Sequence, residues 1–466
     1  MSAPRQVVSQ VVVVGAGPVG LLLAGDLRRD GTDVLVVERL DEPMTESRAA
    51  QLTTRTAELL HERGLAGFLA EAEPEPKSHF GGLDFDVSRV DSPYAGNRKV
   101  PQYRTEAALT RRATVLGVEL LRSHELTGLH QTGDHVTCEL HGPAGKVEIR
   151  AQFVVGCDGE DSTVRRLGGF EFPVVPASRQ LLRADVTGLD VPDRRFERFE
   201  HGLAVAATRG GVTRVMVHEA GRQPLPGVPS FGDVVRSWAK VTGEDISHGG
   251  ATWVDAFDNT RGQVTRYRNG RVLLAGDAAH RHLPIGGQAI NVGLQDAVNL
   301  GWKLAATVAG WAPPDLLDTY HDERHPVGAR TLETVAAQEL LLLGGPEAEA
   351  LRAVLAELLT EPAVQEYLAG LVSGLDIRYA ISRHPRVGTR LHTELLTEGK
   401  PVLFAPVAEA EPWASRVRWA PGPDRVLVRP DGYIAWADGD DVELGAALRR
   451  WFGEPPDVSS TPDEEL

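Results

Sequence analysis

The chain is poor in cysteine and in long apolar runs. Its 466 residues contain two cysteines, Cys138 and Cys157, so a disulfide framework is excluded and both are expected to be buried, reduced thiols. Apolar runs such as 11–14 and 340–343 are far shorter than the roughly 20 residues of a membrane-spanning helix. Because residues 1–10 lack an apolar signal segment, we expect a cytoplasmic protein without a membrane partner.

Positive charge is scarce as well. The 49 lysines and arginines are outnumbered by 65 aspartates and glutamates, which gives a formal net charge of −16. Nucleic acid and anionic membranes require a concentrated basic face, so neither is expected as a partner. We also see no histidine, cysteine and carboxylate spacing typical of a metal site, and we expect no metal. The remaining composition, 42% hydrophobic and 24% charged, is typical of a globular enzyme with two or three domains.

Residues 11–39 carry the strongest local pattern. Four valines typical of a buried parallel strand precede a G-x-G-x-x-G triplet, an apolar helix over 18–28 and a second strand over 33–37. In such a unit the first glycine permits a tight turn, the second lets a pyrophosphate approach the backbone, and the third lets the helix pack closely on the strand. The three glycines are Gly15, Gly17 and Gly20.

Glu38 completes this unit at the end of the second strand. An acid at about this distance from the glycines, roughly 20 residues, meets the ribose hydroxyls of an adenine dinucleotide and disfavours a 2′-phosphate. The site therefore predicts FAD or NAD rather than NADP, without separating the first two. A glycine triplet alone would also fit a plain strand-to-helix turn, but strand, helix and acid together favour dinucleotide binding.

Two later stretches have parallel-strand character. Residues 147–166 predict a strand that turns at Asp158-Gly159, followed by a short helix that starts at Ser162. The strand 272–275 ends at Gly276-Asp277, and a glycine-containing loop then leads into an apolar helix whose N-terminus, near Asn291, is an expected anion site. Between these stretches, an antiparallel sheet is predicted from the β-rich segments 180–186, 203–208 and 213–219.

The motifs GAGPVG, CDGEDSTVRR and GDAAHRHLPIGGQAIN resemble, in order and spacing, the class A FAD-dependent aromatic hydroxylases of the para-hydroxybenzoate hydroxylase fold. The likeness is greatest to actinobacterial hydroxylases that tailor aromatic polyketides of the angucycline and anthracycline type. It implies an α/β fold with a Rossmann-like FAD domain of GR2 type, a β-sheet substrate domain and a thioredoxin-like C-terminal domain. The implied boundaries are 1–76, 99–171 and 268–385 for the FAD domain, 77–98 and 172–267 for the substrate domain, and 386–466 for the C-terminal domain.

The same resemblance implies roles for individual residues. The ADP half of FAD would be held by Gly15, Gly17, Pro18, Val19, Gly20, Glu38 and Arg39. The flavin side would be contacted by Arg48 and Gln102, the shared FAD and NADPH motif would be Asp158 and Gly159, and the ribityl chain would be held at Gly276 and Asp277. The flavin ring would be lined by the segment Pro284 to Asn291, here called the ring-lining loop, through Pro284, Gly286, Gly287, Gln288, Ala289, Ile290 and Asn291.

Two residues of this loop depart from the family pattern Gly-Gly-Gln-Gly-Leu-Asn. Ala289 and Ile290 stand where the family usually has Gly and Leu, and Ala289 leaves less space beside the ring. This departure bears on flavin mobility and on substrate shape. The C-terminal segment 386–466 contains no cysteine, so it cannot carry out disulfide chemistry, and we expect a structural role or an oligomer contact in a monomer or homodimer.

The resemblance implies hydroxylation of an electron-rich polycyclic phenol. NADPH, or NADH, would reduce FAD, O2 would add at the flavin C4a, and the resulting hydroperoxide would transfer one oxygen atom. The protein must hold the substrate and exclude water. Since no second G-x-G-x-x-G unit follows, the nicotinamide is expected to bind transiently.

The sequence says less about which residues line the substrate pocket and which residue could act as a base. Trp253 and Phe257 are candidate substrate contacts, although ordinary core aromatics are an equal alternative. His280, beside the ring-lining loop, could accept a phenol proton near neutral pH, and a structural histidine is the alternative.

Three other functions are weighed against hydroxylation. A Baeyer–Villiger enzyme acting on a polycyclic quinone shares the fold and stays open. Flavin-dependent halogenases carry a Trp-x-Trp-x-Ile-Pro motif that this sequence lacks. A non-catalytic flavin-binding protein is the third alternative, and the intact motifs at Gly15, Asp158 and Asp277 argue against it.

Overall fold

A mixed eight-stranded sheet forms the centre of the computed structural model, which describes residues 6–45, 49–405 and 407–456. Its strand order is β18-β19-β10-β1-β2-β7, and β9 and β8 continue from β10. β1 pairs in parallel with both β2 and β10, as the valine run predicts. The strands are β1 (Gln6–Val14), β2 (Val34–Val37), β7 (Glu119–Leu121), β8 (Glu125–Gln131), β9 (Val136–Gly142), β10 (Gly145–Gly156), β18 (Arg268–Asn269) and β19 (Val272–Leu274).

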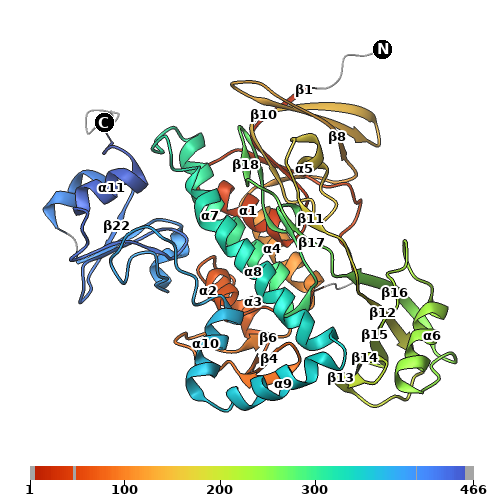
Figure 1. The fold of residues 1–466 in the computed structure, drawn as a ribbon. Coiled ribbons are helices and arrows are strands. Elements are labelled where there is room, and N and C mark those ends of the chain that lie inside the picture. Colours follow the sequence, from red (N-terminus) through yellow and green to blue (C-terminus); the bar gives the residue numbers. More distant parts are fainter. Residues whose placement is uncertain (1–5, 46–48, 406, 457–466) are drawn as a thin grey trace.

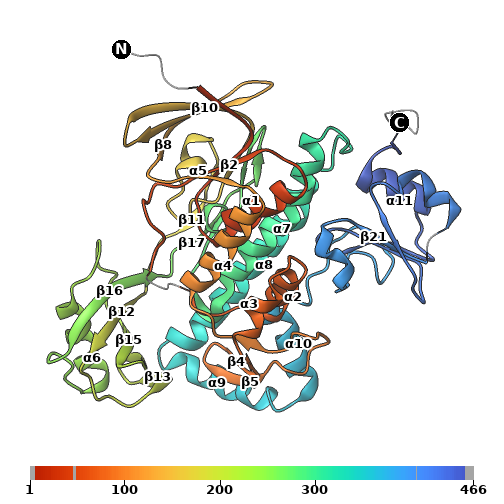
Figure 2. The same ribbon diagram turned by 180° about the vertical axis from the view of Figure 1, so that it is seen from behind.

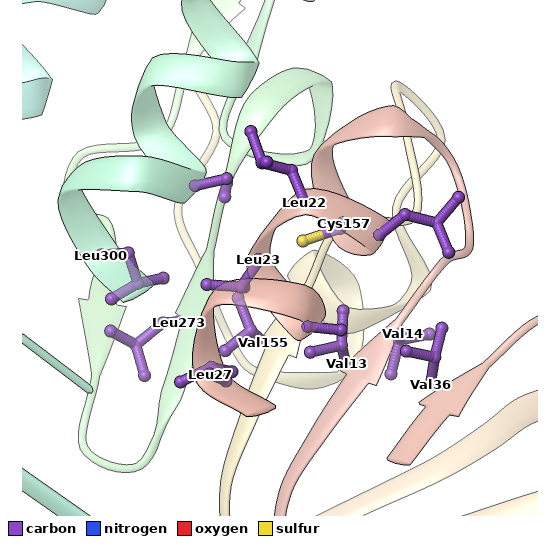
Figure 3. Packing of buried hydrophobic residues seen from close by; sticks show 14 of the residues in the cluster. Val13, Val14, Leu22, Leu23, Leu27, Val36, Val155, Cys157, Leu273 and Leu300 are labelled. Atoms are coloured by element: carbon purple, nitrogen blue, oxygen red, sulfur yellow. The ribbon is translucent and has the colours of Figure 1, made fainter. Parts of the chain in front are cut away.

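Apolar helices cover this sheet. In Figure 3, Leu23 and Leu27 of α1 lie beside the strand that carries Val155, and Leu300 of α7 belongs to the same buried cluster. This arrangement confirms the predicted strand–turn–helix unit and the α/β class. The helices of this part are α1 (Pro18–Arg29), α2 (Thr54–His61), α3 (Ala66–Ala70), α4 (Gln102–Val115), α5 (Thr163–Leu167), α7 (Gln288–Val308) and α8 (Thr319–Leu343).

A five-stranded antiparallel sheet forms the substrate region, with strand order β13-β14-β15-β12-β16. All three predicted β-rich segments are strands of this sheet. One face is covered by α6 (Phe231–Thr242), whose Trp238 is fully buried against it. The strands are β12 (Gln180–Thr187), β13 (Arg194–Phe199), β14 (Gly202–Arg209), β15 (Val212–Glu219) and β16 (Gly250–Asp258).

Residues 77–98 do not join this sheet by strand pairing. They contain a separate hairpin, β4 (Lys77–Phe80) with β5 (Leu83–Asp86), which packs on α9 (Glu347–Leu358) and α10 (Pro362–Ser373). A side-chain contact connects the hairpin to the sheet, because the rings of His79 and Phe196 lie 4.4 Å apart. The division into three domains stays a prediction. A second short pair joins β3 (Pro74–Glu75) and β6 (Asn97–Arg98).

A small three-stranded sheet connects the two larger ones. It has the order β11-β17-β20, and β20 lies directly before the ring-lining loop. The loop therefore continues from a strand that belongs to neither large sheet. The elements are β11 (Val174–Val175), β17 (Arg261–Gln263), β20 (His280–Arg281) and the single turns η1 (Gly276–Ala278) and η2 (Ile285–Gly287).

The C-terminal part lies on the opposite side of the central sheet from the substrate region in both ribbon views (Figures 1 and 2). It contains a four-stranded sheet, β22-β21-β23-β24, and an amphipathic helix that buries Trp451 against Trp302 of α7. The elements are η3 (Glu394–Glu398), β21 (Val402–Phe404), η4 (Ala408–Trp413), β22 (Arg418–Ala420), β23 (Val426–Val428), β24 (Ile434–Ala437) and α11 (Leu444–Phe452).

Candidate functional site

The turn between β1 and α1 has the shape that a pyrophosphate requires. Gly15 has a φ of +106°, and a Cβ placed on Gly20 would lie 2.0 Å from the carbonyl oxygen of Gly15, so neither position tolerates a side chain. A Cβ on Gly17 would meet no atom of the described residues within 4 Å. Gly17 is also the N-cap of α1 and offers no capping side chain, so the first N–H groups of the helix are available to an anion. This open cradle fits the diphosphate of FAD.

Glu38 is fixed against this turn. Its two carboxylate oxygens accept hydrogen bonds from the backbone N–H of Ala16 at 2.8 Å and of Leu40 at 2.9 Å. Arg39 follows it and is exposed. The acid therefore lies beside the G-x-G loop, as its spacing predicts.

Glu106 of α4 is a neighbour of Glu38 that sequence reasoning missed. Burial raises the pKa of Glu106 to about 7, and the charge of Glu38 contributes to this rise while Arg122 opposes it. A second acid, with a raised pKa, therefore lies near Glu38 beside the cradle. In the sequence, Glu106 is only a carboxylate in the first turns of an amphipathic helix. That pattern alone is typical of an ordinary solvated side chain.

The Asp158-Gly159 turn is tied down by its own side chain. The Asp158 carboxylate accepts hydrogen bonds from Ser162 Oγ at 2.5 Å, Thr163 N at 2.7 Å and Val164 N at 3.0 Å. Burial raises its pKa. These bonds show that turn chemistry accounts for much of this motif, so its contact with FAD or NADPH stays a prediction.

The three motif turns converge at the carboxyl ends of neighbouring strands. A Cβ on Gly15 would lie 2.4 Å from the carbonyl oxygen of Cys157, and one on Gly276 would lie 3.1 Å from the side chain of Val19. Arg165 connects the second turn to the third by donating to the carbonyl of Ala278 at 3.0 Å. In open α/β sheets, ligands bind where such turns meet. Asp277 is exposed at this place, as a ribityl contact requires.

A buried carboxylate holds the third turn. Asp296 of α7 accepts from Gly276 N at 3.1 Å and contacts His280 Nε2 at 2.8 Å, while its other oxygen accepts from Arg324 Nε at 2.7 Å. Burial alone would raise the pKa of Asp296, but the charges of Arg324 and His280 lower it below its usual value. Asp296 and Arg324 carry no motif signal and were missed.

His280 is engaged by this carboxylate. Its side chain is fully buried, and its Nε2 lies against Asp296. The geometry favours the structural alternative, because a base must reach the substrate proton. His282 is also buried, which lowers its pKa to about 4 and keeps its ring neutral near pH 7.

The ring-lining loop presents backbone on one side and anchors itself on the other. Gly286 and Gly287 both have a φ of +68°, and the helix α7 begins directly afterwards at Gln288, earlier than the expected start near Asn291. Pro284, Gly286, Gly287, Ala289 and Ile290 keep accessible surface, whereas Gln288 and Asn291 are buried.

The two buried side chains of the loop hold it in place. Asn291 donates to the carbonyls of Gly287 at 2.6 Å and Gln51 at 3.0 Å, and accepts from Thr53 N at 2.9 Å. Gln288 donates to the carbonyl of Val372 in α10 at 3.1 Å. Both residues therefore shape the loop rather than present their side chains to a ring.

Gln102 begins α4 and holds the segment that follows Arg48. It accepts from Ala49 N at 3.2 Å, and its own N–H donates to the carbonyl of Ala49 at 2.9 Å. Arg48 itself lies outside the described residues. The expected flavin contacts of both residues stay predictions.

Phe257 and Trp253 share the face of β16 that points away from α6. Phe257 packs on the apolar cluster that contains Leu283 and Ile285 of the ring-lining region. Trp253 instead lies 4.4 Å from the guanidinium of Arg183, measured to the ring centroid, and 5.5 Å from that of Arg214. The structure thus brings Phe257 to the loop, while arginines cover Trp253. Arg183 is a buried arginine in a strand that sequence reasoning missed.

In the described ranges, no helix is long and apolar enough to span a bilayer, and no group of three or more histidine, cysteine or acidic side chains could hold a metal ion.

Comparison with known proteins gives one consistent family. Residues 8–335 match the family described as FAD binding domain, and residues 380–455 match the C-terminal region of aromatic-ring hydroxylases. The chain is 40% identical to the 12-dehydrotetracycline 5-monooxygenase/anhydrotetracycline 6-monooxygenase of Streptomyces rimosus subsp. rimosus, over 96% of this chain and 99% of that protein. It is 38% identical to the dialkyldecalin synthase of Streptomyces rugosporus, over 95% of this chain and 98% of that protein.

A solved structure agrees with these relatives. CabE, an aromatic hydroxylase from angucycline biosynthesis, matches with a TM-score of 0.91 and 44% identity, over 96% of this chain and all of that one. The matched regions include every turn of the cradle and the ring-lining loop. The chain therefore belongs to the FAD-dependent aromatic-ring hydroxylases, and it is a flavin monooxygenase.

Proposed function

We propose that this monooxygenase hydroxylates a polycyclic aromatic polyketide, a phenol of the angucycline or anthracycline kind, with a nicotinamide cofactor and O2. The observation that carries the proposal is the apolar cluster beside the ring-lining loop, which contains Leu283 and Ile285 and against which Phe257 packs. An apolar wall there suits a large aromatic ring system and keeps water from the oxygen-transfer step. The tetracycline relative and the angucycline hydroxylase support the same substrate class.

FAD, when bound, supplies the redox chemistry that activates O2. The protein's part is to bind and orient. The cradle at Gly17 and the acid at Glu38 would hold the ADP half, and Asp277 would hold the ribityl chain. The ring would lie along the accessible backbone of Gly286 and Gly287.

His280 would act as a positioning residue rather than as a base. It shares the Asp296 carboxylate with the Gly276 backbone, so it orients the turn that carries Asp277. Polyhydroxylated aromatics ionise readily, so the phenol can lose its proton without a dedicated protein base. The alternative role, direct proton transfer by His280, would require that this buried ring become accessible.

We further infer that NADPH or NADH binds transiently, because the sequence holds a single G-x-G-x-x-G unit before a helix. A cytoplasmic monomer or homodimer completes the proposal. The C-terminal part, which lacks cysteine, would serve as a structural support.

The test is aerobic NADPH and NADH oxidation by the purified protein with FAD, with and without a panel of polycyclic phenols. Stimulated oxidation with a product heavier by one oxygen atom is expected, and fragmentation separates a ring hydroxyl from the lactone of a Baeyer–Villiger reaction. Bound flavin without stimulation by any phenol would contradict the proposed substrate class.

A further inference from the structure

The hairpin of β4 and β5 carries a histidine between the ring-lining loop and the substrate sheet. β4 packs against η2 of the loop, and the backbone N–H of Gly81 donates to Gln338 Oε1 at 3.4 Å. A Cβ on Gly286 would lie 3.2 Å from the same oxygen, so Gln338 joins the hairpin turn to the loop. His79 belongs to β4, and its ring centroid lies 4.4 Å from that of Phe196 in β13. His79 therefore lies where the loop and the substrate sheet meet.

Phe196 reaches this place from the substrate sheet. It has a φ of +53° at the point where the pairing of β13 with β14 shifts its register. Left-handed conformations are uncommon outside glycine, and residues held in them cluster at functional sites, where a bulge re-aims a side chain. The side chain of Phe196 packs on the apolar cluster that contains Leu283 and Ile285. His79 is thus in contact with a residue of the proposed substrate wall.

The hydrogen bond at Nδ1 fixes which nitrogen of His79 carries the proton. Nδ1 lies 3.3 Å from the backbone N–H of Gly82, which can only donate, so Nδ1 accepts and the neutral ring carries its proton on Nε2. Burial, helped by the charges of Arg195 and Lys99, lowers the pKa of His79 to about 4, so the ring is neutral near pH 7. No described residue accepts a hydrogen bond from Nε2, and this nitrogen keeps accessible surface. It is a free donor.

The charges around this donor favour a ligand atom that accepts. Lys99 Nζ donates to Gln51 Oε1 at 2.6 Å, and Gln51 Nε2 donates to the carbonyl of Gly286 at 3.4 Å, so this cation is connected to the ring-lining loop. Arg195 is the second cation near His79. Each cation has a partly exposed acid beside it, Glu75 at 3.6 Å from Lys99 and Asp84 at 3.5 Å from Arg195. A carbonyl or phenolate oxygen suits an N–H donor flanked by cations, whereas an ammonium group does not.

We propose that His79 binds the substrate by donating its Nε2–H to a carbonyl or phenolate oxygen of the polycyclic ring system, which packs against Phe196. The inference rests on the proposed function, because the ligand is the substrate of that reaction. His79 takes no proton in this role, since Nε2 already carries one and Nδ1 is engaged by Gly82. It selects aromatic compounds that have an oxygen on the edge turned toward the hairpin.

Two amide variants separate the two ring nitrogens. The amide of His79→Gln reaches the position of Nε2 and still donates there, whereas that of His79→Asn reaches only the position of Nδ1 and can accept from Gly82. The full chain loaded with FAD is titrated calorimetrically, without nicotinamide, with 2-hydroxy-1,4-naphthoquinone, and 2-methylnaphthalene is the matched probe without oxygen. We expect His79→Asn to weaken binding of the naphthoquinone by roughly tenfold and His79→Gln by less than about threefold. Neither variant should change binding of 2-methylnaphthalene by more than about twofold.

Equal affinity of His79→Asn and the unmodified protein for the naphthoquinone would overturn the inference. Weaker binding by His79→Gln than by His79→Asn would assign the histidine to the hairpin turn, and an equal loss for 2-methylnaphthalene would assign it to pocket shape. No binding of the naphthoquinone by the unmodified protein would also overturn it. The titration requires no turnover, so an oxygenated product together with an unaffected His79→Asn would remove this inference and leave the proposed function standing.

Discussion

The two faces of α7 are equally buried but are stabilised in different ways. The face toward the central sheet is apolar and packs on α1 and β1. The opposite face is polar, and it is covered by α8 and the C-terminal part. The apolar face includes Leu294, Ala297, Val298, Leu300 and Leu304, and the polar face includes Gln288, Asn291, Gln295, Asn299 and Lys303.

A buried charge network accounts for the polar face. Glu323 of α8 accepts from Lys303 Nζ at 2.9 Å and from both terminal nitrogens of Arg429 at 2.6 and 2.7 Å. Arg429 also pairs with Asp431, which accepts from Asn299 at 3.1 Å. Such networks add little net stability over an apolar contact, but they are costly to break and fix one arrangement. The cofactor side therefore depends on close packing, and the C-terminal side on a buried charge network beside the Trp302–Trp451 contact.

The largest effect is expected from breaking the close packing. Gly20→Val would place a side chain 2.0 Å from the Gly15 carbonyl, so we expect loss of the fold, more than about 4 kcal/mol, and of bound FAD. Gly17→Ala is the matched control, since its Cβ meets open space. It should fold normally and weaken FAD binding by roughly tenfold or more. Flavin absorbance per protein and thermal melting distinguish the two, and a stable Gly20→Val protein with full flavin would refute this view of the cradle.

Breaking the pairing should have the next largest effect. Arg429→Met leaves the buried Asp431 without its cation and Glu323 with Lys303 alone, and it should cost about 3 to 5 kcal/mol in the free energy of unfolding. Arg425→Met removes an exposed ion pair with Asp438 at 3.7 Å and should change it by less than about 0.5 kcal/mol. Denaturant titration measures both. Similar values for the two variants would show that the network is not what holds the C-terminal part.

Two buried histidines extend the comparison from paired charges to buried side chains that stay neutral. Burial lowers the pKa of His79 and of His282 to about 4, against about 6.5 in an unfolded chain. Between these values the unfolded chain binds protons that the folded protein does not, so stability falls as pH falls from about 6.5 to 4. Each histidine contributes at most about 3.5 kcal/mol to this loss. The double variant His79→Gln, His282→Gln should lose less stability between pH 6.5 and 4, as measured by melting temperature against pH. An unchanged loss of stability would contradict this prediction.

The smallest effect concerns the first turn of α7, where both faces begin. Ala289→Gly restores the residue that the family pattern favours and costs at most about 1 kcal/mol in helix propensity. If the Ala289 methyl limits flavin movement, the variant should consume more NADPH per product and release more peroxide. Peroxide measured against product formed decides this, and an unchanged ratio would assign the residue to substrate shape.

The sequence was informative where local rules decide the structure. The turn at Gly15 to Gly20, the strand 272–275 and the three strands of the substrate sheet follow from patterns a few residues long, and the structure confirms them. The start of α7 was misplaced because two successive glycines, Gly286 and Gly287, take left-handed conformations and allow the helix to begin at once.

The remaining features depend on distant partners. The polar residues Asn299 and Lys303 are covered by Glu323 and Arg429, which come from later parts of the chain. The pairing of Asp296 with Gly276, His280 and Arg324 depends on the same long-range packing. Single-sequence patterns do not report which charges meet, so the network and the engagement of His280 were not predictable.

The most direct test of the account is turnover of an accepted polycyclic phenol under ¹⁸O2, followed by mass spectrometry of the product. One ¹⁸O atom in the product, placed by fragmentation in a new ring hydroxyl, is the predicted result. A product that is an isomer of the substrate, without ¹⁸O, would contradict this function and would indicate that the cradle holds FAD for a reaction without oxygen transfer.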